Sequence, residues 1–453
     1  MNYPPLPERL AHARDQIRQL SDLRLSGRVS GLSSLAARVA GLSGHLRVGD
    51  RVALEGPARA NVIGEVTSIH DGIARVMTFD PLHGLGEGSR AVRLRAGGSL
   101  AVSDGWRGRV VDPLGRPLDG KGPLPVGPLA RPVRVAPPAA VQRGRLGARL
   151  DLGVRALDLF TPCRQGQRLG LFAGSGIGKS TLLASLARHG RFDVVVLALV
   201  GERGREVREF LEDDLGPEGL ARAVVVVTTS DAPPLMRRQA GDAAMTVAEH
   251  FRDQGLSVLL LLDSLTRYCQ ALREIGLATG EPPATRGYPA SVFADLPCLL
   301  ERAGPGPMRA DGTAGQITAI FTVLVEGDDH NEPVADAARG ILDGHVILDR
   351  RIAEAGRFPP IDVLRSVSRT APDCLEPADR DLVRRARAIL AAQDSMADMV
   401  RLGAYQAGTD AATDEALRLG PRVLEMLRQA KGEFTRAADS FAVLADILAG
   451  VDA

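Results

Sequence analysis

The stretch from Gly166 to Leu183 constrains this chain most, because a short apolar run there leads into a glycine-dense turn and then into an apolar, helix-like segment. The turn follows the pattern G-x-x-x-x-G-K-[ST], whose backbone N–H groups surround phosphate oxygens. The positive end of the helix that follows also favours an anion at this position. The sequence therefore predicts a nucleotide-binding loop between a buried strand and a helix.

Lys179 and Ser180 have the most specific chemistry in this loop. The lysine of the pattern reaches the β- and γ-phosphates, and the serine hydroxyl binds Mg²⁺. The chain has only three lysines among 56 lysine and arginine residues, and one of the three lies here. Arginine does not replace a compact ammonium charge in a phosphate cradle, so this lysine supports the interpretation. The residues expected to contact the nucleotide are Ala173, Gly174, Ser175, Gly176, Ile177, Gly178, Lys179, Ser180 and Thr181.

The composition argues against several broad classes of protein. A net charge of +1 gives no global field toward nucleic acid, and 4% aromatic residues argue against base-stacking platforms. The four cysteines are scattered without a C-x-x-C pair, which favours free thiols in a reducing cytosol over a metal site. No apolar signal core and no membrane-length apolar run is visible in the sequence. We therefore expect a soluble, cytoplasmic protein.

The chain is expected to begin with a short amphipathic helix and a β-barrel. Apolar residues recur at helical spacing between 6 and 25, which predicts a helix that docks on its own domain, binds a partner or lies on a membrane surface. From 25 to about 94, short β-rich runs alternate with turn signals such as Asp71-Gly72, a texture typical of a small closed barrel. We therefore place an N-terminal regulatory segment at 1–24 and a β-barrel domain at 25–97.

Beyond a connector rich in proline and glycine, strand-like and helix-like segments alternate, which indicates a parallel sheet with right-handed crossovers. The predicted strands lie near 168–173, 193–200, 223–229, 257–263, 316–325 and 345–349. The predicted helices lie near 179–189, 204–215, 232–254, 264–277, 290–302 and 334–342. From Glu376 the strands stop, and helix-periodic segments follow at 377–396, 411–431 and 432–449. We therefore place an α/β domain at 98–375 and a helical domain at 376–453.

One predicted strand ends in an aspartate. Val258–Asp263 is an apolar run that delivers an acid to the carboxyl edge of the sheet, where the ligands of open α/β sheets bind. Taken alone, such an aspartate can simply cap the next helix. Because a phosphate loop lies upstream, Asp263 is instead predicted to hold Mg²⁺.

A second predicted strand leads to a glutamate. Glu202 follows the buried run Val194–Val200 and would face the γ-phosphate. A carboxylate there can orient the attacking water, which is the role that hydrolysis requires. The alternative is that four charged residues are surface charges that open a helix: Glu202, Arg203, Arg205 and Glu206.

Four longer motifs are similar to a known family: Gly201–Phe210, Leu262–Tyr268, Arg273–Pro289 and Val325–Asp336. They resemble rotary-type hexameric ATPases related to the catalytic β subunit of ATP synthase. Within that group they are most similar to the type III secretion ATPases, in particular the flagellum-specific ATPase family. The resemblance runs from about residue 25 to the C-terminus. It implies a multidomain α/β fold with an N-terminal β-barrel, a RecA-like P-loop ATPase core and a helical C-terminal domain.

The resemblance also implies a role for each matching residue. Lys179 and Ser180 match the phosphate-loop pair. Asp263 matches the acid linked to Mg²⁺, and Glu202 matches the catalytic glutamate. Arg203, directly after the glutamate, is implied to help fix the γ-phosphate.

Two further positions gain a role only through the resemblance. Arg369 lies where the family places an arginine finger, which enters the neighbouring subunit's site and bridges the transferring phosphoryl group. Phe358 matches the aromatic residue that stacks on adenine, with ordinary core packing as the alternative. Ala173 departs from the general loop pattern at its first glycine, which a negative φ permits. Two further departures are the loop 304–315, which is long and glycine-rich, and Thr370, which is less apolar than expected.

By resemblance, the protein is a Mg²⁺-dependent ATPase that forms a ring, expected to be a hexamer, and energises export of flagellar proteins through a type III secretion apparatus. ATP and Mg²⁺ are the implied cofactors. The implied partners are a regulatory stator-like protein at the N-terminal helix, and the export gate and chaperone–substrate complexes at the C-terminal domain, with no nucleic acid. The implied location is the cytoplasm, docked at the cytoplasmic face of the inner-membrane export apparatus, with peripheral association with the membrane.

Three alternatives stay open. The ATPase of a virulence-type type III secretion system would share every catalytic residue named above. A ring ATPase that translocates RNA would need a domain with basic and aromatic faces, which residues 1–95 do not show clearly. A non-catalytic ring subunit would bind nucleotide without hydrolysing it, but such subunits characteristically lack the glutamate, and Glu202 is present.

Overall fold

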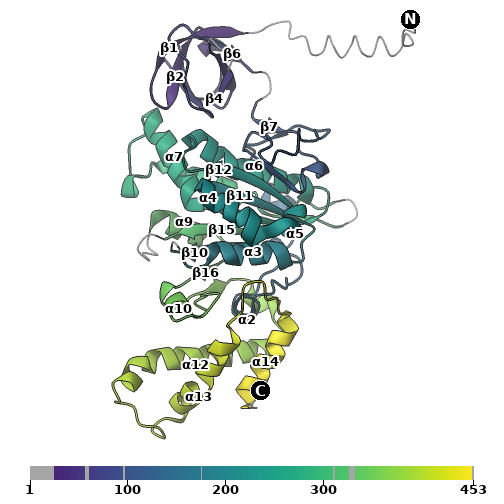
Figure 1. Ribbon diagram of the computed structural model, residues 1–453, viewed down its shortest axis with the longest axis vertical. Coiled ribbons are helices and arrows are strands. Elements are labelled where there is room, and N and C mark those ends of the chain that lie inside the picture. Colours follow the sequence, from purple (N-terminus) through teal and green to yellow (C-terminus); the bar gives the residue numbers. More distant parts are fainter. Residues whose placement is uncertain are drawn as a thin grey trace, which may run out of the picture. The chain divides into compact units, whose positions relative to one another are not determined.

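The computed structural model describes residues 25–56, 61–94, 97–174, 176–309, 312–325 and 332–450. The chain divides into two compact units, one ending at Gly98 and the other beginning at Ser99 (Figure 1). The helix predicted within 1–24 lies outside the described residues, and so does Ser175. Among the helices of the described part, none combines the length and the hydropathy that crossing a membrane requires.

The first unit is a closed antiparallel barrel with the strand order β1-β2-β5-β4-β3-β6. Its strands are β1 (Ser26–Leu32), β2 (Ala36–Ala40), β3 (Arg51–Glu55), β4 (Asn61–His70), β5 (Ile73–Thr78) and β6 (Arg90–Arg93). Small and β-branched side chains such as Val39, Val52 and Val76 alternate into the barrel and form its core. Asp71 and Gly72 join β4 to β5 with φ values of +48° and +77°, the geometry of a two-residue hairpin turn. The predicted barrel and this turn are confirmed.

The second unit is built on a mostly parallel sheet with the order β17-β16-β10-β15-β13-β11-β12-β8. Its strands are β8 (Arg109–Val111), β10 (Arg168–Ala173), β11 (Val194–Glu202), β12 (Ala223–Thr229), β13 (Ser257–Asp263), β14 (Gly304–Pro305), β15 (Gln316–Leu324), β16 (Gly344–Ile347) and β17 (Val367–Ser368). Only two pairings among these strands are antiparallel, β14 with β15 and β16 with β17. A separate ribbon pairs β7 (Ser99–Leu100) with β9 (Arg131–Pro132). Because helices cover both faces of the sheet, its central strands are continuous apolar runs rather than alternating ones.

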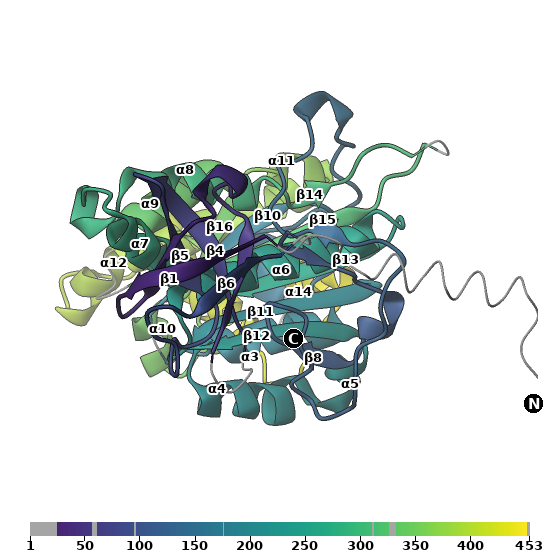
Figure 2. The ribbon, with the colours of Figure 1, turned by 90° about the horizontal axis from the view of Figure 1, so that it is seen from above.

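Helices cover the two faces of this sheet in separate layers (Figure 2). One face carries α3 (Lys179–His189), α4 (Gly204–Glu209) and α5 (Gly216–Ala221), with a π-helical turn at Phe210–Leu215 between the last two. The other face carries α6 (Pro234–Arg252), α7 (Leu265–Thr279), α8 (Ala290–Leu300) and α9 (Pro333–Ile341). Shorter helices are α2 (Arg155–Phe160), α10 (Arg350–Glu354) and α11 (Ala371–Cys374). The predicted α/β core is confirmed.

Three helices follow the sheet: α12 (Pro377–Arg401), α13 (Ala411–Met426) and α14 (Ala437–Ala449). Their apolar faces continue the hydrophobic core that lies under α3, so the domain limit placed at 375/376 stays a prediction. The helices expected at 411–431 and 432–449 are both shorter than predicted. The chain leaves α13 after Met426 and makes a loop before α14, with Gly432 at a φ of +81°. This loop lines a cavity of the candidate site.

Candidate functional site

The phosphate loop lies at the carboxyl end of β10, between β16 and β15. Gly176 and Gly178 adopt φ values of +76° and +89°, a left-handed conformation that favours glycine, and α3 begins directly afterwards at Lys179. Ala173 is the last residue of β10 and does not have a positive φ, so alanine is accommodated at the first position of the pattern, as expected. The loop is therefore placed between a buried strand and a helix N-terminus, as the sequence predicted.

Two carboxylates converge on the lysine of this loop. The Nζ atom of Lys179 contacts Oδ1 of Asp263 and lies 3.8 Å from Oε1 of Glu202. Asp263 ends β13 and Glu202 ends β11, and because these strands are parallel neighbours their carboxyl ends meet at one edge of the sheet. The structure thus brings together three residues that are separated by up to 84 positions in sequence.

A backbone irregularity directs Glu202 toward this edge. The pairing of β11 with β12 shifts between Val200 and Glu202, and Gly201 between them has a φ of +68°. A bulge of this kind bends the strand and changes the direction of the next side chain. A residue other than glycine at 201 would be strained there, so the glycine that precedes the glutamate has a structural reason.

The surroundings of the carboxylates differ. Burial, with the neighbouring charge of Asp263, raises the pKa of Glu202 to about 7, although Lys179 acts in the opposite direction. A carboxylate whose pKa lies near neutrality is suited to accept a proton from water. Asp263 is buried and accepts a hydrogen bond of 2.7 Å from the hydroxyl of Thr322 on β15. Sequence reasoning missed Thr322, whose only signal is a hydroxyl within the apolar run of a central strand.

Lys179 and Glu202 line a cavity of about 690 Å³, together with the loop glycines, Ser180 and Thr181. The Ser180 hydroxyl and the Asp263 carboxylate, which the resemblance implies as Mg²⁺ ligands, are hard oxygen donors. Such a set fits Mg²⁺, which proteins usually hold by one or two carboxylates together with substrate phosphates. The residues present therefore fit the cofactor that the resemblance implies.

A second cavity of about 510 Å³ adjoins the first and shares Gly178 and Thr181 with it. Phe358 lies in its wall with 46% of its surface exposed, which excludes ordinary core packing as the reason for this aromatic residue. Other lining residues of this cavity come from the loop Arg428–Glu433, between α13 and α14. Size, apolar lining and an exposed aromatic ring make this a fitting pocket for a nucleobase.

The loop Arg428–Glu433 was not found by sequence reasoning. It is tied to the start of α2, where the backbone N–H of Arg155 donates to Oε1 of Gln429 at 2.7 Å. The side chain of Arg155 donates to Thr435 and to the carbonyls of Met426 and Arg428, and it pairs with Glu433. One signal was available in the sequence, because Lys431 is one of only three lysines in the chain. In the structure, Lys431 pairs with Asp214 at 2.7 Å.

Two predicted residues do not join the three-residue arrangement. Arg203 lines the first cavity, but its side chain is 80% exposed and pairs with Glu206 at 3.1 Å. Arg369 is exposed and donates to the carbonyl of Arg339 at 3.1 Å. Its backbone lies at the amino end of β10, since its N–H donates to Asp343, which itself bonds to Arg168. The phosphate loop follows the other end of β10, five residues along the strand from Arg168. Five strand steps span about 16 Å, and this distance exceeds the reach of an arginine side chain.

Comparison with known proteins places this arrangement in a class. Residues 153–368 match the model of the ATP synthase alpha/beta family, nucleotide-binding domain, and residues 375–446 match that of the T3SS EscN ATPase C-terminal domain. The assembled ATPase EscN of the enteropathogenic E. coli type III secretion system superimposes with a TM-score of 0.85 and 36% identity, over 93% of this chain and 100% of that one. The fold and the phosphate loop are those of a type III secretion ATPase.

Relatives over nearly the full length narrow this class further. The flagellum-specific ATP synthase of Caulobacter vibrioides is 51% identical over 433 residues, covering 95% of this chain and 98% of the relative. That of Salmonella typhimurium is 43% identical over 429 residues, covering 92% of each chain. The chain belongs to the flagellum-specific ATP synthase family. The predicted family, fold class and ATPase activity are confirmed, and the flagellar interpretation is favoured over the virulence-type alternative.

Proposed function

We propose that the protein hydrolyses ATP with Mg²⁺ as a homo-oligomeric ring and thereby energises export of flagellar proteins through a type III secretion apparatus. The observation that carries this proposal is the split arrangement of the site residues. Lys179, Asp263 and Glu202 meet at one edge of the sheet, whereas Arg369 lies at the opposite edge of the same subunit. One subunit supplies an almost complete phosphate site and an arginine that cannot reach it.

Each residue at the carboxyl edge has a distinct task in this proposal. Lys179 binds the β- and γ-phosphates, and the loop N–H groups surround them. Ser180 and Asp263 would hold Mg²⁺, which when bound neutralises charge on the β- and γ-oxygens. Glu202 orients the attacking water and takes its proton, a task that a pKa near 7 favours. Phe358 and the loop Arg428–Glu433 hold the base.

The exposed arginine is the reason for a ring. In this proposal Arg369 enters the neighbouring subunit's site and stabilises charge on the transferring phosphoryl group. Arg203, at the wall of the cavity, would contact the γ-phosphate after its side chain turns from Glu206. EscN has been solved in an assembled form and in complex with its central stalk EscO, which supports an oligomer and a regulatory partner here. A hexamer is the ring size we propose.

The remaining assignments concern partners and place. We propose that residues 1–24 engage a stator-like regulator, and that the region of α12–α14 faces the export gate and chaperone–substrate complexes. This would place the protein at the cytoplasmic face of the inner-membrane export apparatus. These assignments rest on the family alone.

The test is the rate of ATP hydrolysis measured against protein concentration, with assembly followed by light scattering in the same samples. Because the finger comes from a neighbour, we expect the rate per subunit to rise steeply and in step with assembly. A rate per subunit that is constant from the monomer to the ring would overturn the proposed shared site. An assembled ring that does not hydrolyse ATP would instead favour the non-catalytic alternative.

A further inference from the structure

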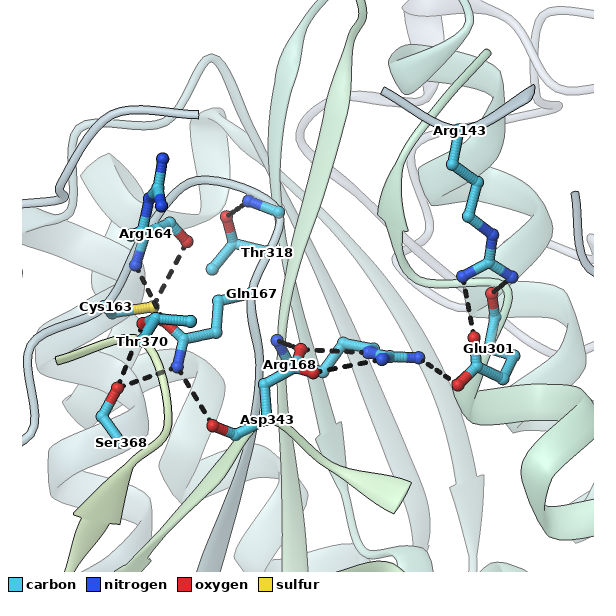
Figure 3. Close-up of polar contacts among 11 residues, drawn as sticks. Arg143, Cys163, Arg164, Gln167, Arg168, Glu301, Thr318, Asp343, Ser368 and Thr370 are labelled. Atoms are coloured by element: carbon cyan, nitrogen blue, oxygen red, sulfur yellow. Dashed lines mark hydrogen bonds and ion pairs between the residues drawn. The ribbon is translucent and has the colours of Figure 1, made fainter. Parts of the chain in front are cut away.

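Gln167 is a buried side chain that joins two segments far apart in the sequence (Figure 3). Its Nε2 atom donates to the hydroxyl of Ser368 at 3.0 Å and to the carbonyl of Asp343 at 3.5 Å. Its Oε1 atom accepts from the hydroxyl of Thr370 at 2.7 Å and from the N–H of Arg164 at 2.9 Å. All four hydrogen-bonding positions of the amide are therefore used, as a buried polar group requires.

Two of these partners flank the proposed finger. We call Ser368–Thr370 the finger segment, because Arg369 lies between the two hydroxyl residues that Gln167 holds. Ser368 is buried and also donates to the carbonyl of Pro162 at 2.7 Å. The N–H of Arg369 donates to the carbonyl of Asp343 at 2.9 Å. The backbone is thus fixed on both sides of a side chain that is itself exposed.

Asp343 is in turn fixed by charge. Its carboxylate receives two hydrogen bonds of 3.1 Å from the guanidinium of Arg168 and one of 3.0 Å from the Arg168 N–H. Arg168 continues to Glu301 at 2.6 Å, and Glu301 pairs with Arg143 at 2.7 Å (Figure 3). Bidentate pairs of this kind restrict geometry as well as add stability. The finger segment therefore rests on an anchored base at the start of β10.

We infer that Gln167 is a positioning residue for Arg369, holding the finger segment so that its guanidinium reaches the phosphoryl group in the neighbouring subunit's site. The inference rests on the proposed function, since it concerns the residue that the ring shares. A charge that must meet a transition state is effective only when its supporting groups fix it within a fraction of an ångström. The amide of Gln167 bonds to the residues on both sides of Arg369, which fixes the backbone that carries the guanidinium.

The first test uses two variants of the network and a matched control. Gln167→Glu keeps the size and the acceptor oxygens but loses the donors, and Thr370→Val removes the hydroxyl at nearly constant shape. Thr318→Val is the control, because Thr318 is buried and accepts from the Gly166 N–H at 2.9 Å, in the same turn but away from the finger segment. We expect kcat to fall about tenfold in both network variants with the KM for ATP within about twofold, and little change in the control.

Thermal unfolding and ring assembly are measured for all three variants. A kcat loss in Thr318→Val as large as in Thr370→Val would overturn the inference, because general loosening of the turn would then be sufficient. A raised KM at unchanged kcat would overturn it as well, because the amide would then act on the subunit's own phosphate loop. Thr370→Val keeps the test decisive if Gln167→Glu does not fold.

The second test is mixing, which separates the two subunits of a shared site. Glu202→Gln subunits lack the water-orienting carboxylate but present an intact Arg369 to their neighbours. If Gln167 acts through the finger, added Glu202→Gln subunits should restore turnover in Gln167→Glu subunits, as they should in Arg369→Ala subunits. The inference is supported if Glu202→Gln subunits rescue both Gln167→Glu and Arg369→Ala. Rescue means that the ATP turnover of the mixture exceeds the sum of the turnovers of its two components.

The remaining outcomes are distinguishable. Rescue of Arg369→Ala without rescue of either network variant would overturn the inference and leave the proposed function standing. No rescue of Arg369→Ala would overturn the in-trans site itself, and the inference would be overturned with it.

Discussion

The two ends of strand β10 carry the two halves of the proposed chemistry, and they are built differently. At the carboxyl end, Lys179 meets Asp263 and lies near Glu202 in a cavity of the same subunit. At the amino end, Gln167 and Asp343 fix a segment whose arginine lines neither of the two cavities described above. In the proposed function the first end binds the nucleotide, and the second supports a residue that acts in a neighbouring subunit.

The difference teaches how a ring can make catalysis depend on assembly. In the proposed function, a single subunit can bind the nucleotide at the carboxyl end, because the residues that line both cavities come from one chain. In the same proposal, the amino end contributes to catalysis only when a neighbouring subunit is present. Variants at the amino end should therefore change turnover and leave binding intact, whereas several variants at the carboxyl end should change binding.

The largest expected effect is at the amino end. Arg369→Ala should lower kcat by at least about 10³-fold while nucleotide affinity stays near its original value, because the finger acts on the transition state. The control is Arg365→Ala, four residues earlier and paired with Asp349 at 3.6 Å, which should change kcat little. Steady-state kinetics with a fluorescent-nucleotide titration measures both quantities. Equal losses in the two variants would contradict the finger.

The next effect is at the carboxyl end. Glu202→Gln should lower kcat by roughly 10²- to 10³-fold, because the amide cannot accept the proton of the attacking water. Nucleotide binding should persist, since Lys179 and the loop glycines are unchanged. Glu212→Gln, whose side chain is 61% exposed and pairs with Arg208, is the control. If Glu202→Gln turns over at the original rate, the catalytic assignment is wrong.

The sequence predicted the carboxyl end well because its signals are local. The strand 168–173, the glycine loop and the helix from Lys179 follow one another directly, and each carboxylate ends an apolar run. Parallel pairing then brings these ends to one edge without further information. The family resemblance was needed for Arg369, because an arginine after Ser-Val-Ser has no local pattern of its own.

The parts that the sequence did not reveal are contacts between distant segments. Gln167 lies 201 positions from Ser368, and no sequence pattern pairs the two residues. The base-pocket loop Arg428–Glu433 was predicted to be helical, yet it is irregular because it bonds to α2 and to the backbone of Phe358. Polar contacts of this kind depend on the folded arrangement, which helical periodicity does not encode.

A smaller effect tests whether the base pocket belongs to the carboxyl end. Phe358→Ala should raise the KM for ATP by about three- to tenfold with kcat nearly unchanged, because stacking on the base contributes to substrate and transition state alike. Phe358→Tyr keeps the ring and should stay near the original KM. A variant with unchanged KM for ATP would show that the exposed ring serves another purpose.

The smallest effect concerns the one part of the carboxyl end that comes from the C-terminal helices. Arg155 holds the base-pocket loop through Thr435, Met426 and Arg428, and it pairs with Glu433. Arg155→Lys keeps the charge but cannot form this fork of hydrogen bonds, so the KM for ATP should rise about twofold. Arg385→Lys is the control, because Arg385 pairs with Glu415 between α12 and α13, away from the pocket, and exposed pairs contribute little. If both variants change the KM for ATP equally, Arg155 does not hold the loop. Nucleotide binding at the carboxyl end would then depend only on residues of the local sequence motifs.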